Sequence, residues 1–248
     1  MSTQTTTRVG TFVWHENVSA DPEAALSFYS ELFGWEVEVF KPGEMDYAMI
    51  KSAGQTHGGF PPAPEGVPNH WLGHVCVEKV DETVEKAKAA GGTVVHGPMG
   101  IPEVGRFAVI ADPQGAVVSA YEPAGEGPAS AGVFVWDELG TQDVEAAERF
   151  YGDVFGWTSV DMGAEYGGYR IFQLGETRAA GMMKLPDPAA PSGWAPYVAV
   201  EDADATVAKA KELGGSALLE PMDVPNVGRI AYLRDPQGAV FGILKPST

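Results

Sequence analysis

The alternation of apolar and polar positions predicts a strand, a helix and further strands in the first part of the chain. Thr11–Val18 opens with aromatic and β-branched side chains, which favour strands. Asp21 is then a strong N-cap, Pro22 suits the first helical position, and apolar residues recur at helical spacing until Gly34 stops the helix. The next expected strands are Trp35–Phe40 and Tyr47–Lys51.

A second unit of the same kind follows a proline-rich connection at Pro61–Pro68. Its pattern predicts a strand at His70–Val77, an amphipathic helix at Asp81–Ala90 and a short strand at Thr93–His96. A hairpin is expected around Asp112–Gly115, where proline and glycine occupy the places that a type I turn favours. The order strand, helix, strands is therefore expected twice within the first half of the chain.

The second half of the chain repeats the first. Asp21–Trp35 recurs as Asp143–Trp157 with 9 of 15 positions identical, and Val104–Val117 recurs as Val227–Val240 with 10 of 14 identical. The offsets are 122 and 123 residues, which is far longer than the roughly 20 to 50 residues of a solenoid repeat. The repeat therefore predicts two homologous domains.

A linker rich in glycine, proline, alanine and serine, Glu122–Gly132, is expected to join these domains. The predicted domains are residues 1–125 and 126–248. Positions where the two copies differ are the ones expected to be specialised.

Charge and composition narrow the classes of partner. The formal net charge is -18 and the chain has no cluster of lysine and arginine, so we expect neither nucleic acid nor an anionic membrane surface as a partner. No apolar run approaches the roughly 18 residues of a membrane span, and the first residues lack the apolar stretch of a signal peptide. Cys76 is the sole cysteine, which rules out an intrachain disulfide. A cytoplasmic protein is expected.

The motifs together resemble one superfamily of known proteins. A strand, a helix containing Phe-Tyr and ending in Phe-Gly-Trp, further strands and then Asp-Pro-x-Gly are similar to the vicinal-oxygen-chelate superfamily, which includes glyoxalase I, bleomycin-resistance proteins and extradiol dioxygenases. The similarity is greatest to its two-domain actinobacterial branch, whose members often carry antigen or hydroxylase labels. It implies an α+β fold of two tandem glyoxalase-like domains, each made of two paired βαβββ modules that form a half-open barrel around a cavity.

The resemblance also implies where a metal would be bound. Counted from the shared motifs, the superfamily's metal-ligand positions fall in this sequence on Trp14, Leu72, Ser119, Trp136, Ala195 and Gly242. None of these side chains is a good ligand for a divalent cation, which prefers imidazole or carboxylate in such a site. We therefore expect no metal and no other cofactor. A displaced divalent-metal site that uses Glu16 and His74 is the alternative.

Side chains two residues apart share a face of a strand, and this places candidate groups in the first cavity. If Trp14 points inward then Glu16 does too, and by the same argument His74 and Tyr121 join them. A carboxylate that faces an imidazole can act as a general acid/base pair, so Glu16 and His74 are the candidate catalytic residues. The alternative is that His74 only forms hydrogen bonds inside a barrel.

Aromatic residues recur at matching positions in the two copies. Trp14 and Trp136 correspond, as do Tyr47 and Tyr169, and walls of this kind suit flat organic ligands. The alternative is that they build the barrel cores. Glu16 corresponds to Glu138, and a buried ion pair of each with Arg106 or Arg229 is one possible arrangement. The expected ligand-binding residues are Trp14, Tyr47, Trp71, Tyr121, Trp136, Glu138 and Tyr197.

The leading hypothesis is a glyoxalase/bleomycin-resistance-like protein that binds a small, aromatic organic molecule in a barrel cavity without metal. The first alternative is an enzyme of isomerase, lyase or hydroxylase type that acts in the first domain through Glu16 and His74. The second alternative is a degenerate interaction domain whose cavities are filled by its own side chains. Because one chain holds both domains, a monomer is favoured over a dimer.

Overall fold

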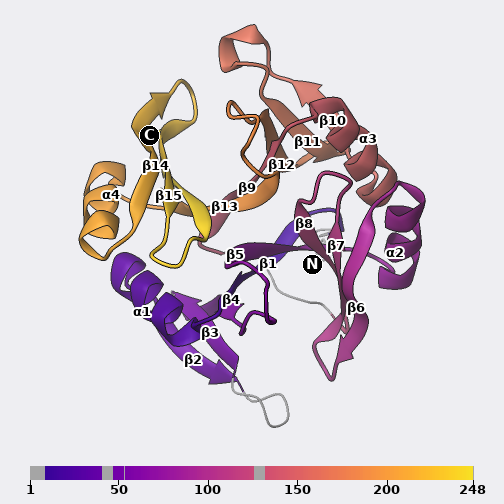
Figure 1. Cartoon of the computed structure of the whole chain (residues 1–248), viewed down its shortest axis with the longest axis horizontal. Helices are drawn as coiled ribbons and strands as arrows, with labels where there is room; N and C mark the ends of the chain where they lie inside the picture. Colours follow the sequence, from indigo (N-terminus) through magenta and orange to yellow (C-terminus); the bar gives the residue numbers. More distant parts are fainter. Residues whose placement is uncertain (1–8, 41–46, 53, 126–131, 248) are drawn as a thin grey trace, which may run out of the picture. The chain divides into compact units, whose positions relative to one another are not determined.

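The computed structural model describes residues 9–40, 47–52, 54–125 and 132–247. Figure 1 shows the order of its elements. The first half contains β1 (Phe12–Val18), α1 (Pro22–Phe33), β2 (Glu36–Phe40), β3 (Tyr47–Ser52), β4 (Gln55–Phe60), β5 (His70–Cys76), α2 (Val80–Ala89), β6 (Thr93–Ile101), β7 (Gly105–Ala111) and β8 (Val117–Pro123).

The second half repeats this order, with a short 3-10 helix at Ala164–Tyr166 added. It contains β9 (Phe134–Thr141), α3 (Val144–Phe155), β10 (Thr158–Asp161), β11 (Arg170–Leu174), β12 (Thr177–Lys184), β13 (Gly193–Ala199), α4 (Ala203–Glu212), β14 (Ser216–Val224), β15 (Gly228–Arg234) and β16 (Val240–Pro246). Each half is thus a pair of βαβββ modules.

The strands form two eight-stranded sheets, one from each half of the chain. Their orders are β2-β3-β4-β1-β5-β8-β7-β6 and β10-β11-β12-β9-β13-β16-β15-β14. Neither sheet is closed, because its two end strands do not pair. The expected α+β fold, with two βαβββ modules and an open sheet in each half of the chain, is confirmed.

Local chemistry explains why the helices begin and end where the sequence predicts. The Asp21 side chain accepts a hydrogen bond from the backbone N–H of Ala24, which satisfies one of the free donors at the start of α1. Gly34 ends the helix in the left-handed conformation, with a φ of 70°, which glycine adopts without steric cost. Asp143 caps α3 in the same way.

β4 is a strand that the sequence pattern does not predict, because its Gly58-Gly59 pair is typical of a turn. It pairs in parallel with β1, with His15 opposite Gly58 and Glu16 opposite Gly59. A methyl group at Gly58 would lie 2.2 Å from the His15 carbonyl oxygen. The glycine therefore permits a close approach of two backbones, which is one of the recognised uses of glycine inside a strand.

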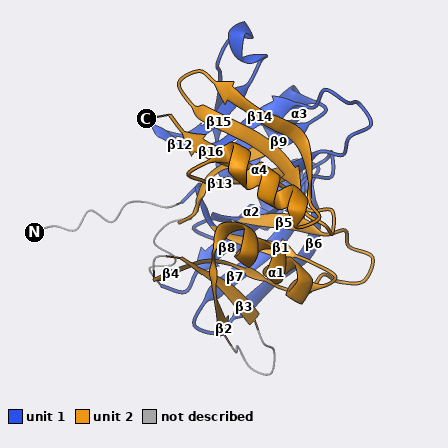
Figure 2. Cartoon of the chain, turned by 90° about the vertical axis from the view of Figure 1, so that its left-hand side faces the viewer, with its two compact units in different colours: residues 1–13, 74–129, 139–193 blue, residues 14–73, 130–138, 194–248 orange. Residues whose placement is uncertain are grey.

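The chain divides into two compact units that do not coincide with its two halves (Figure 2). Unit 1 comprises residues 1–13, 74–129 and 139–193, and unit 2 comprises residues 14–73, 130–138 and 194–248. Each sheet draws its strands from one half, whereas each unit draws on both halves. The domain limits at 1–125 and 126–248 therefore stay a prediction, and part of the predicted linker, residues 126–131, lies outside the described residues.

In unit 2 the repeated motifs of the sequence bind each other. Tyr29 of the Phe-Tyr motif donates a hydrogen bond from its hydroxyl to Asp235 of the second Asp-Pro-Gln-Gly turn, at 2.9 Å. Trp71 donates its indole N–H to the same tyrosine oxygen at 2.9 Å, and Gln237 donates to the backbone oxygen of Asp21. We call the hydrogen bond between a Phe-Tyr tyrosine and an Asp-Pro-Gln-Gly aspartate the tyrosine–aspartate clasp.

Unit 1 contains the equivalent clasp, formed from the other copies of the same motifs. Tyr151 of α3 donates from its hydroxyl to Asp112 at 3.1 Å. Gln114 donates to the backbone oxygen of Asp143 and accepts from its backbone nitrogen. Helices from the two halves also pack together inside each unit, α2 with α3 in unit 1 and α1 with α4 in unit 2. The repeated motifs therefore have a structural role. In each unit, the Phe-Tyr helix of one half binds the Asp-Pro-Gln-Gly turn of the other half.

Unit 2 has an extensive apolar core around α1. It includes Phe28, Tyr29, Trp35, Phe134 and Phe241, all buried, from segments far apart in the sequence. The described part of the chain contains no helix long and apolar enough to cross a membrane.

Candidate functional site

In the first half, a hydrogen-bond chain within unit 2 runs from Trp14 through Tyr47 to Glu16. The indole N–H of Trp14 donates to the Tyr47 hydroxyl oxygen at 3.1 Å, and that hydroxyl donates to Oε1 of Glu16 at 2.6 Å. All three side chains are partly exposed, whereas the intervening His15 is fully buried. The alternation of β1 therefore presents Trp14 and Glu16 on one partly exposed face.

Gly59 makes room for this hydrogen-bond chain. It lies on β4 between β1 and β3, opposite Glu16 on one side and Met49 on the other. A methyl group in its place would come within 2.2 Å of the Tyr47 hydroxyl oxygen. The tyrosine therefore crosses the backbone of β4 at a residue without a side chain, and so reaches the carboxylate of Glu16 on β1.

The environment keeps Tyr47 protonated. Burial of the phenol raises the pKa of Tyr47 well above its usual value, and the nearby Glu16 carboxylate raises this pKa further. Because the tyrosine holds its proton, it is a stable donor to Glu16 and an acceptor for the indole of Trp14. The indole N–H of Trp14 and the hydroxyl of Tyr47 thus form a chain of donors that ends at the Glu16 carboxylate.

The second half carries a different arrangement around the equivalent carboxylate, Glu138, also within unit 2. Oε1 of Glu138 accepts hydrogen bonds from the hydroxyls of Tyr197, at 3.1 Å, and Tyr232, at 2.9 Å. Burial of the phenol raises the pKa of Tyr232 well above its usual value, with Glu138 as the next cause. The carboxylate is buried, and two tyrosine rings lie edge to face beside it.

Tyr232 is a residue of this cluster that the sequence analysis does not identify. Its counterpart in the first copy is Val109, so the repeat gives no matched tyrosine to notice. The register supplies the missing information: Tyr197 is paired with Gly242 across β13 and β16, and Gly242 with Tyr232 across β16 and β15. Both rings therefore lie at one level of the sheet, over a glycine.

His74 and Tyr121, predicted for the first cavity, belong to unit 1. The imidazole of His74 lies with its ring centre 6.1 Å from that of Phe107 and 6.4 Å from that of Tyr121. Tyr121 is buried, packs with Cys76, and donates its hydroxyl to the backbone oxygen of Val104 at 2.8 Å. Ser119, paired directly with His74 across β5 and β8, is fully buried.

The predicted catalytic pair is divided between the two units. Glu16 belongs to unit 2 and His74 to unit 1, so the pairing of this carboxylate with this imidazole stays a prediction. Within its own unit each residue has an aromatic setting: Tyr47 and Trp14 beside Glu16, and Phe107 and Tyr121 beside His74.

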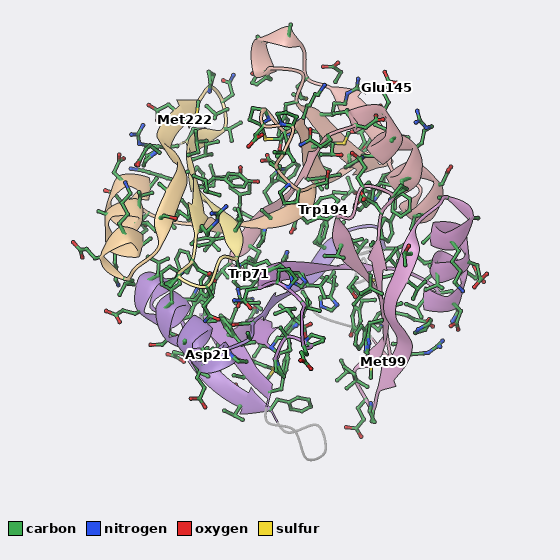
Figure 3. The ribbon with its side chains drawn as sticks, viewed as in Figure 1. Asp21, Trp71, Met99, Glu145, Trp194 and Met222 are labelled. Atoms are coloured by element: carbon green, nitrogen blue, oxygen red, sulfur yellow. The ribbon has the colours of Figure 1, made fainter. Side chains whose placement is uncertain are left out.

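Other predicted residues are placed as follows. Trp71, labelled in Figure 3, is 2% exposed, lies in the core of unit 2 and is hydrogen-bonded to Tyr29, so we do not include it in the ligand site. Trp136 is partly exposed on β9, two residues before Glu138. The expected ion pairs of Arg106 and Arg229 with the two glutamates are wrong.

These arginines bind aspartates at the surface instead. Arg106 forms a bidentate pair with Asp81, and Arg229 forms one with Asp204. A planar guanidinium fits both oxygens of a carboxylate, which explains the bidentate form. Glu16 and Glu138 accept hydrogen bonds from the neutral hydroxyls of tyrosines.

His15 and Asp137 occupy equivalent positions in the two copies and lie together inside unit 2. Nε2 of His15 is 2.8 Å from Oδ1 of Asp137, and both side chains are buried. The imidazole also packs on Phe134, with ring centres 4.2 Å apart. His15 therefore points away from the face that Trp14 and Glu16 share.

A hollow of about 270 Å³ lies against α1, away from these carboxylates. It is lined by Ala24, Phe28, Glu31, Leu213 and Asp235, among others. Asp235 already accepts from Tyr29 and from the backbone nitrogens of Gln237 and Ala239. The Asp235 oxygens are therefore occupied by the tyrosine–aspartate clasp and by the turn. We interpret the hollow as a packing contact between α1 and this turn, and we do not include it in the candidate site.

The described residues contain no group of three or more histidine, cysteine, aspartate or glutamate side chains that could hold a metal ion. The counted metal positions lie on the strands where the superfamily would need them: β1, β5 and β8 in the first half, and β9, β13 and β16 in the second. Their side chains are those of Trp14, Leu72, Ser119, Trp136, Ala195 and Gly242. The residues present do not fit a divalent cation at these positions.

Comparison with known families gives one match in each half of the chain. A model of the Glyoxalase/Bleomycin resistance protein/Dioxygenase superfamily matches residues 15–119 and again residues 133–243. The two matches reproduce the internal repeat.

Two relatives extend over nearly the whole chain. "Putative glyoxylase CFP32" of Mycobacterium tuberculosis is 38% identical over 251 residues, covering 97% of this chain and 96% of the relative. "Anthracycline biosynthesis protein DnrV" of Streptomyces peucetius is 34% identical over 257 residues, covering 95% of this chain and 93% of the relative.

Solved structures share the fold at low identity. The Mn(II)-bound glyoxalase from Novosphingobium aromaticivorans superposes with a TM-score of 0.63 at 17% identity, covering 96% of this chain and 82% of that one. The 2,3-dioxygenase LapB from Pseudomonas sp. KL28 gives a TM-score of 0.64 at 10% identity, covering 96% and 92%. At these identities the likeness concerns the fold.

Proposed function

Because the chain belongs to the Glyoxalase/Bleomycin resistance protein/Dioxygenase superfamily, we propose that its first half binds a small, flat aromatic molecule that carries a hydroxyl group. The observation that carries the proposal is the hydrogen-bond chain from Trp14 through Tyr47 to Glu16 on a partly exposed face of unit 2. Aromatic rings supply the flat surface, and the Glu16 carboxylate accepts a hydrogen bond from the hydroxyl of the ligand.

Two features support a ligand at this place. Trp14 is held by its hydrogen bond to Tyr47, and Tyr47 by its hydrogen bond to Glu16, so little side-chain entropy remains to be lost when a ligand stacks on them. The face is also accessible, in contrast to the buried carboxylate of Glu138 in the second half. A preorganised, accessible aromatic surface is typical of small-molecule sites.

We propose that binding proceeds without a metal ion. The argument is the chemistry of the counted positions, where Trp14, Leu72 and Ser119 replace the imidazoles and carboxylates that a divalent cation prefers. The aromatic character of the ligand is supported by the relative whose name assigns it to anthracycline biosynthesis, since anthracyclines are fused-ring hydroxyquinones.

The test is a titration of tryptophan emission with three probes: 1-hydroxyanthraquinone, 1-naphthol and naphthalene. We expect the oxygen-bearing probes to quench the emission and to bind more tightly than naphthalene. Trp14→Phe should remove most of the emission response, and Tyr47→Phe should weaken 1-naphthol binding roughly two- to tenfold, the effect of one hydrogen bond.

Tyr166→Phe is the matched control for Tyr47→Phe, because this tyrosine lies on the 3-10 helix of the second half. Its binding constants should equal those of the unaltered chain. If none of the three probes binds, or if Trp14→Phe leaves both affinity and quenching unchanged, the proposed site is wrong.

A second candidate function is catalysis of isomerase or lyase type, favoured by the relative named as a glyoxylase. The candidate catalytic residues are those of the sequence analysis, Glu16 in unit 2 and His74 in unit 1. The test is turnover of the hemithioacetal of methylglyoxal and glutathione, with His74→Ala as the variant. Turnover that disappears in a folded His74→Ala chain would support catalysis, and turnover that persists would remove His74 from the mechanism.

A further inference from the structure

Inside each unit, the tyrosine–aspartate clasp joins an element of one half of the chain to an element of the other half. Tyr29 binds Asp235 in unit 2, and their counterparts Tyr151 and Asp112 bind each other in unit 1. The residue types are identical in the two clasps. The helix of a first half would therefore fit the turn of another first half as well as it fits the turn of a second half. The clasp joins halves but does not select which halves are joined.

An aromatic contact at the first strand of each half has the same symmetry. In unit 2, the ring centre of Phe134 on β9 lies 5.8 Å from that of Trp35, which follows α1. In unit 1, the ring centres of the counterparts Phe12 and Trp157 lie 6.1 Å apart. The residue types are again the same, so this contact gives a first half no preference for a second half over another first half.

The contact between His15 and Asp137 differs from these, because each half contributes a different side chain to it. The two residues occupy equivalent positions on β1 and β9, 122 residues apart. Nε2 of His15 lies 2.8 Å from Oδ1 of Asp137, and the side chains are 0% and 7% exposed. A pairing of unlike halves therefore brings an imidazole to a carboxylate. A pairing of like halves would bring together two imidazoles or two carboxylates.

Burial makes a pairing of like halves unfavourable at this contact. Two carboxylates that share a buried site cannot both stay ionised without a large penalty, and two imidazoles offer no carboxylate to either ring. The ring of His15 also packs on Phe134, with ring centres 4.2 Å apart, so Asp137 and the aromatic ring that hold it both come from the second half. A buried polar contact that is satisfied in only one combination discriminates between partners.

We propose that the contact between His15 and Asp137 selects the partner of each half: it favours the pairing of a first half with a second half and disfavours pairing with a second copy of the same half. The surface of β1 that carries His15 thus fits the carboxylate-bearing surface of β9. The inference concerns the assembly of the fold and does not depend on a ligand, so it stands apart from the proposed function.

The experiment changes one residue of the pair in each of two full-length chains. His15→Asp places two carboxylates in unit 2 of the first chain, and Asp137→His places two imidazoles in unit 2 of the second chain. Each variant alone should unfold at a lower urea concentration than the unaltered chain. If the two variants are refolded as an equal mixture, the first half of each chain can find an unlike second half in the other chain. We expect a complex of one copy of each variant, formed by exchange of halves and identified by native mass spectrometry.

Asp81 and Arg106 provide the matched control. They form a bidentate ion pair, but both belong to the first half of the chain. An exchange of halves therefore cannot bring the altered residue of one chain to that of the other. A refolded mixture of Asp81→Arg and Arg106→Asp should give no complex that contains both variants.

The double variant with His15→Asp and Asp137→His gives a second reading within a single chain. It restores a pair of unlike side chains with their places exchanged, so its urea midpoint should lie above those of both single variants. A mixture that forms no complex of the two single variants, or a double variant no more stable than the weaker single variant, would overturn the inference. Single variants as stable as the unaltered chain would also overturn it, because like side chains would then meet without cost.

Discussion

At the scale of single residues, the two equivalent glutamates show how tyrosine hydroxyls help to stabilise a carboxylate inside the fold. Glu16 accepts from one tyrosine and Glu138 from two. A charged carboxylate strengthens each such hydrogen bond to about 1.5–3 kcal/mol, which compensates part of its desolvation. The arginines, which need both oxygens of a carboxylate at once, pair with aspartates at the surface.

Tyrosines whose phenol groups are shielded from water make stability sensitive to alkaline pH. Burial is the largest cause that raises the pKa of Tyr29, Tyr47 and Tyr232 well above 10. The unfolded chain therefore loses these protons first, and the free energy of unfolding should fall as the pH rises above about 10. Below that pH the contribution should be fully present.

Denaturant titrations between pH 8 and pH 11.5 measure this effect. Tyr232→Phe should make the fall in stability above pH 10 less steep, because one of the three groups is gone, and Tyr166→Phe should leave the slope as it is. A slope that is the same in both variants would show that Tyr232 does not hold its proton in the folded state.

At the scale of elements, glycines on central strands decide which side chains can cross a sheet. Gly59 lies under Tyr47, and Gly242 lies beside Tyr197. We expect Gly59→Ala to displace the Tyr47 hydroxyl from Glu16 and to weaken 1-naphthol binding at least as much as Tyr47→Phe does. Gly193→Ala is the control, because a methyl group at Gly193 meets no atom within 4 Å.

Calorimetry with both alanine variants distinguishes the outcomes. A chain with Gly59→Ala that binds 1-naphthol with unaltered affinity would mean that the tyrosine finds another path to the carboxylate, or that its hydroxyl is not part of the site. The thermal unfolding of Gly193→Ala gives the effect of an added methyl group on a strand by itself.

The tyrosine–aspartate clasp is the contact through which helices and turns of the two halves bind each other. Tyr29→Phe removes the donor to Asp235 and the acceptor for Trp71, and all three side chains are buried. We expect the free energy of unfolding to fall by about 1.5–3 kcal/mol, the range for a hydrogen bond to a charged group.

Urea titrations of Tyr29→Phe and Tyr151→Phe compare the two clasps. Each variant should lose stability by a similar amount, because Asp112 and Asp235 have the same set of backbone donors. A loss below 0.5 kcal/mol in both, as is common for surface substitutions, would mean that apolar packing alone joins helix and turn.

At the scale of the whole molecule, the crosswise pairing of motifs bears on the oligomeric state. Each Phe-Tyr helix finds its Asp-Pro-Gln-Gly turn within the same chain, so no motif is left for a second copy to complete. We propose a monomer. Size-exclusion chromatography with light scattering should give a mass near 26.2 kDa at micromolar concentration. A mass of twice this value would show that the clasps form between chains.

The metal content is a second property of the whole molecule. Because the counted ligand positions carry no imidazole or carboxylate, elemental mass spectrometry after equilibration with divalent cations should find well below one metal per chain. About one metal per chain would contradict the count of ligand positions. Glu16 and His74 would then be the first residues to replace.

The sequence by itself determined the order of elements, the internal repeat and the family. These depend on local chemistry: Asp21 caps a helix through a backbone group three residues away, and Gly34 ends it through its own freedom of φ. The missed strand, β4, shows the limit, since its glycines favour a turn locally and are used for a close approach of strands.

Only the tertiary structure decided which groups meet. Tyr47 reaches Glu16 across 31 residues, Tyr232 reaches Glu138 across 94, and Tyr29 reaches Asp235 across 206. Such partners are selected by strand register and by the packing of helices from different halves, and no local pattern in the sequence encodes them. The division of the chain into units that mix its halves follows from the same long-range contacts.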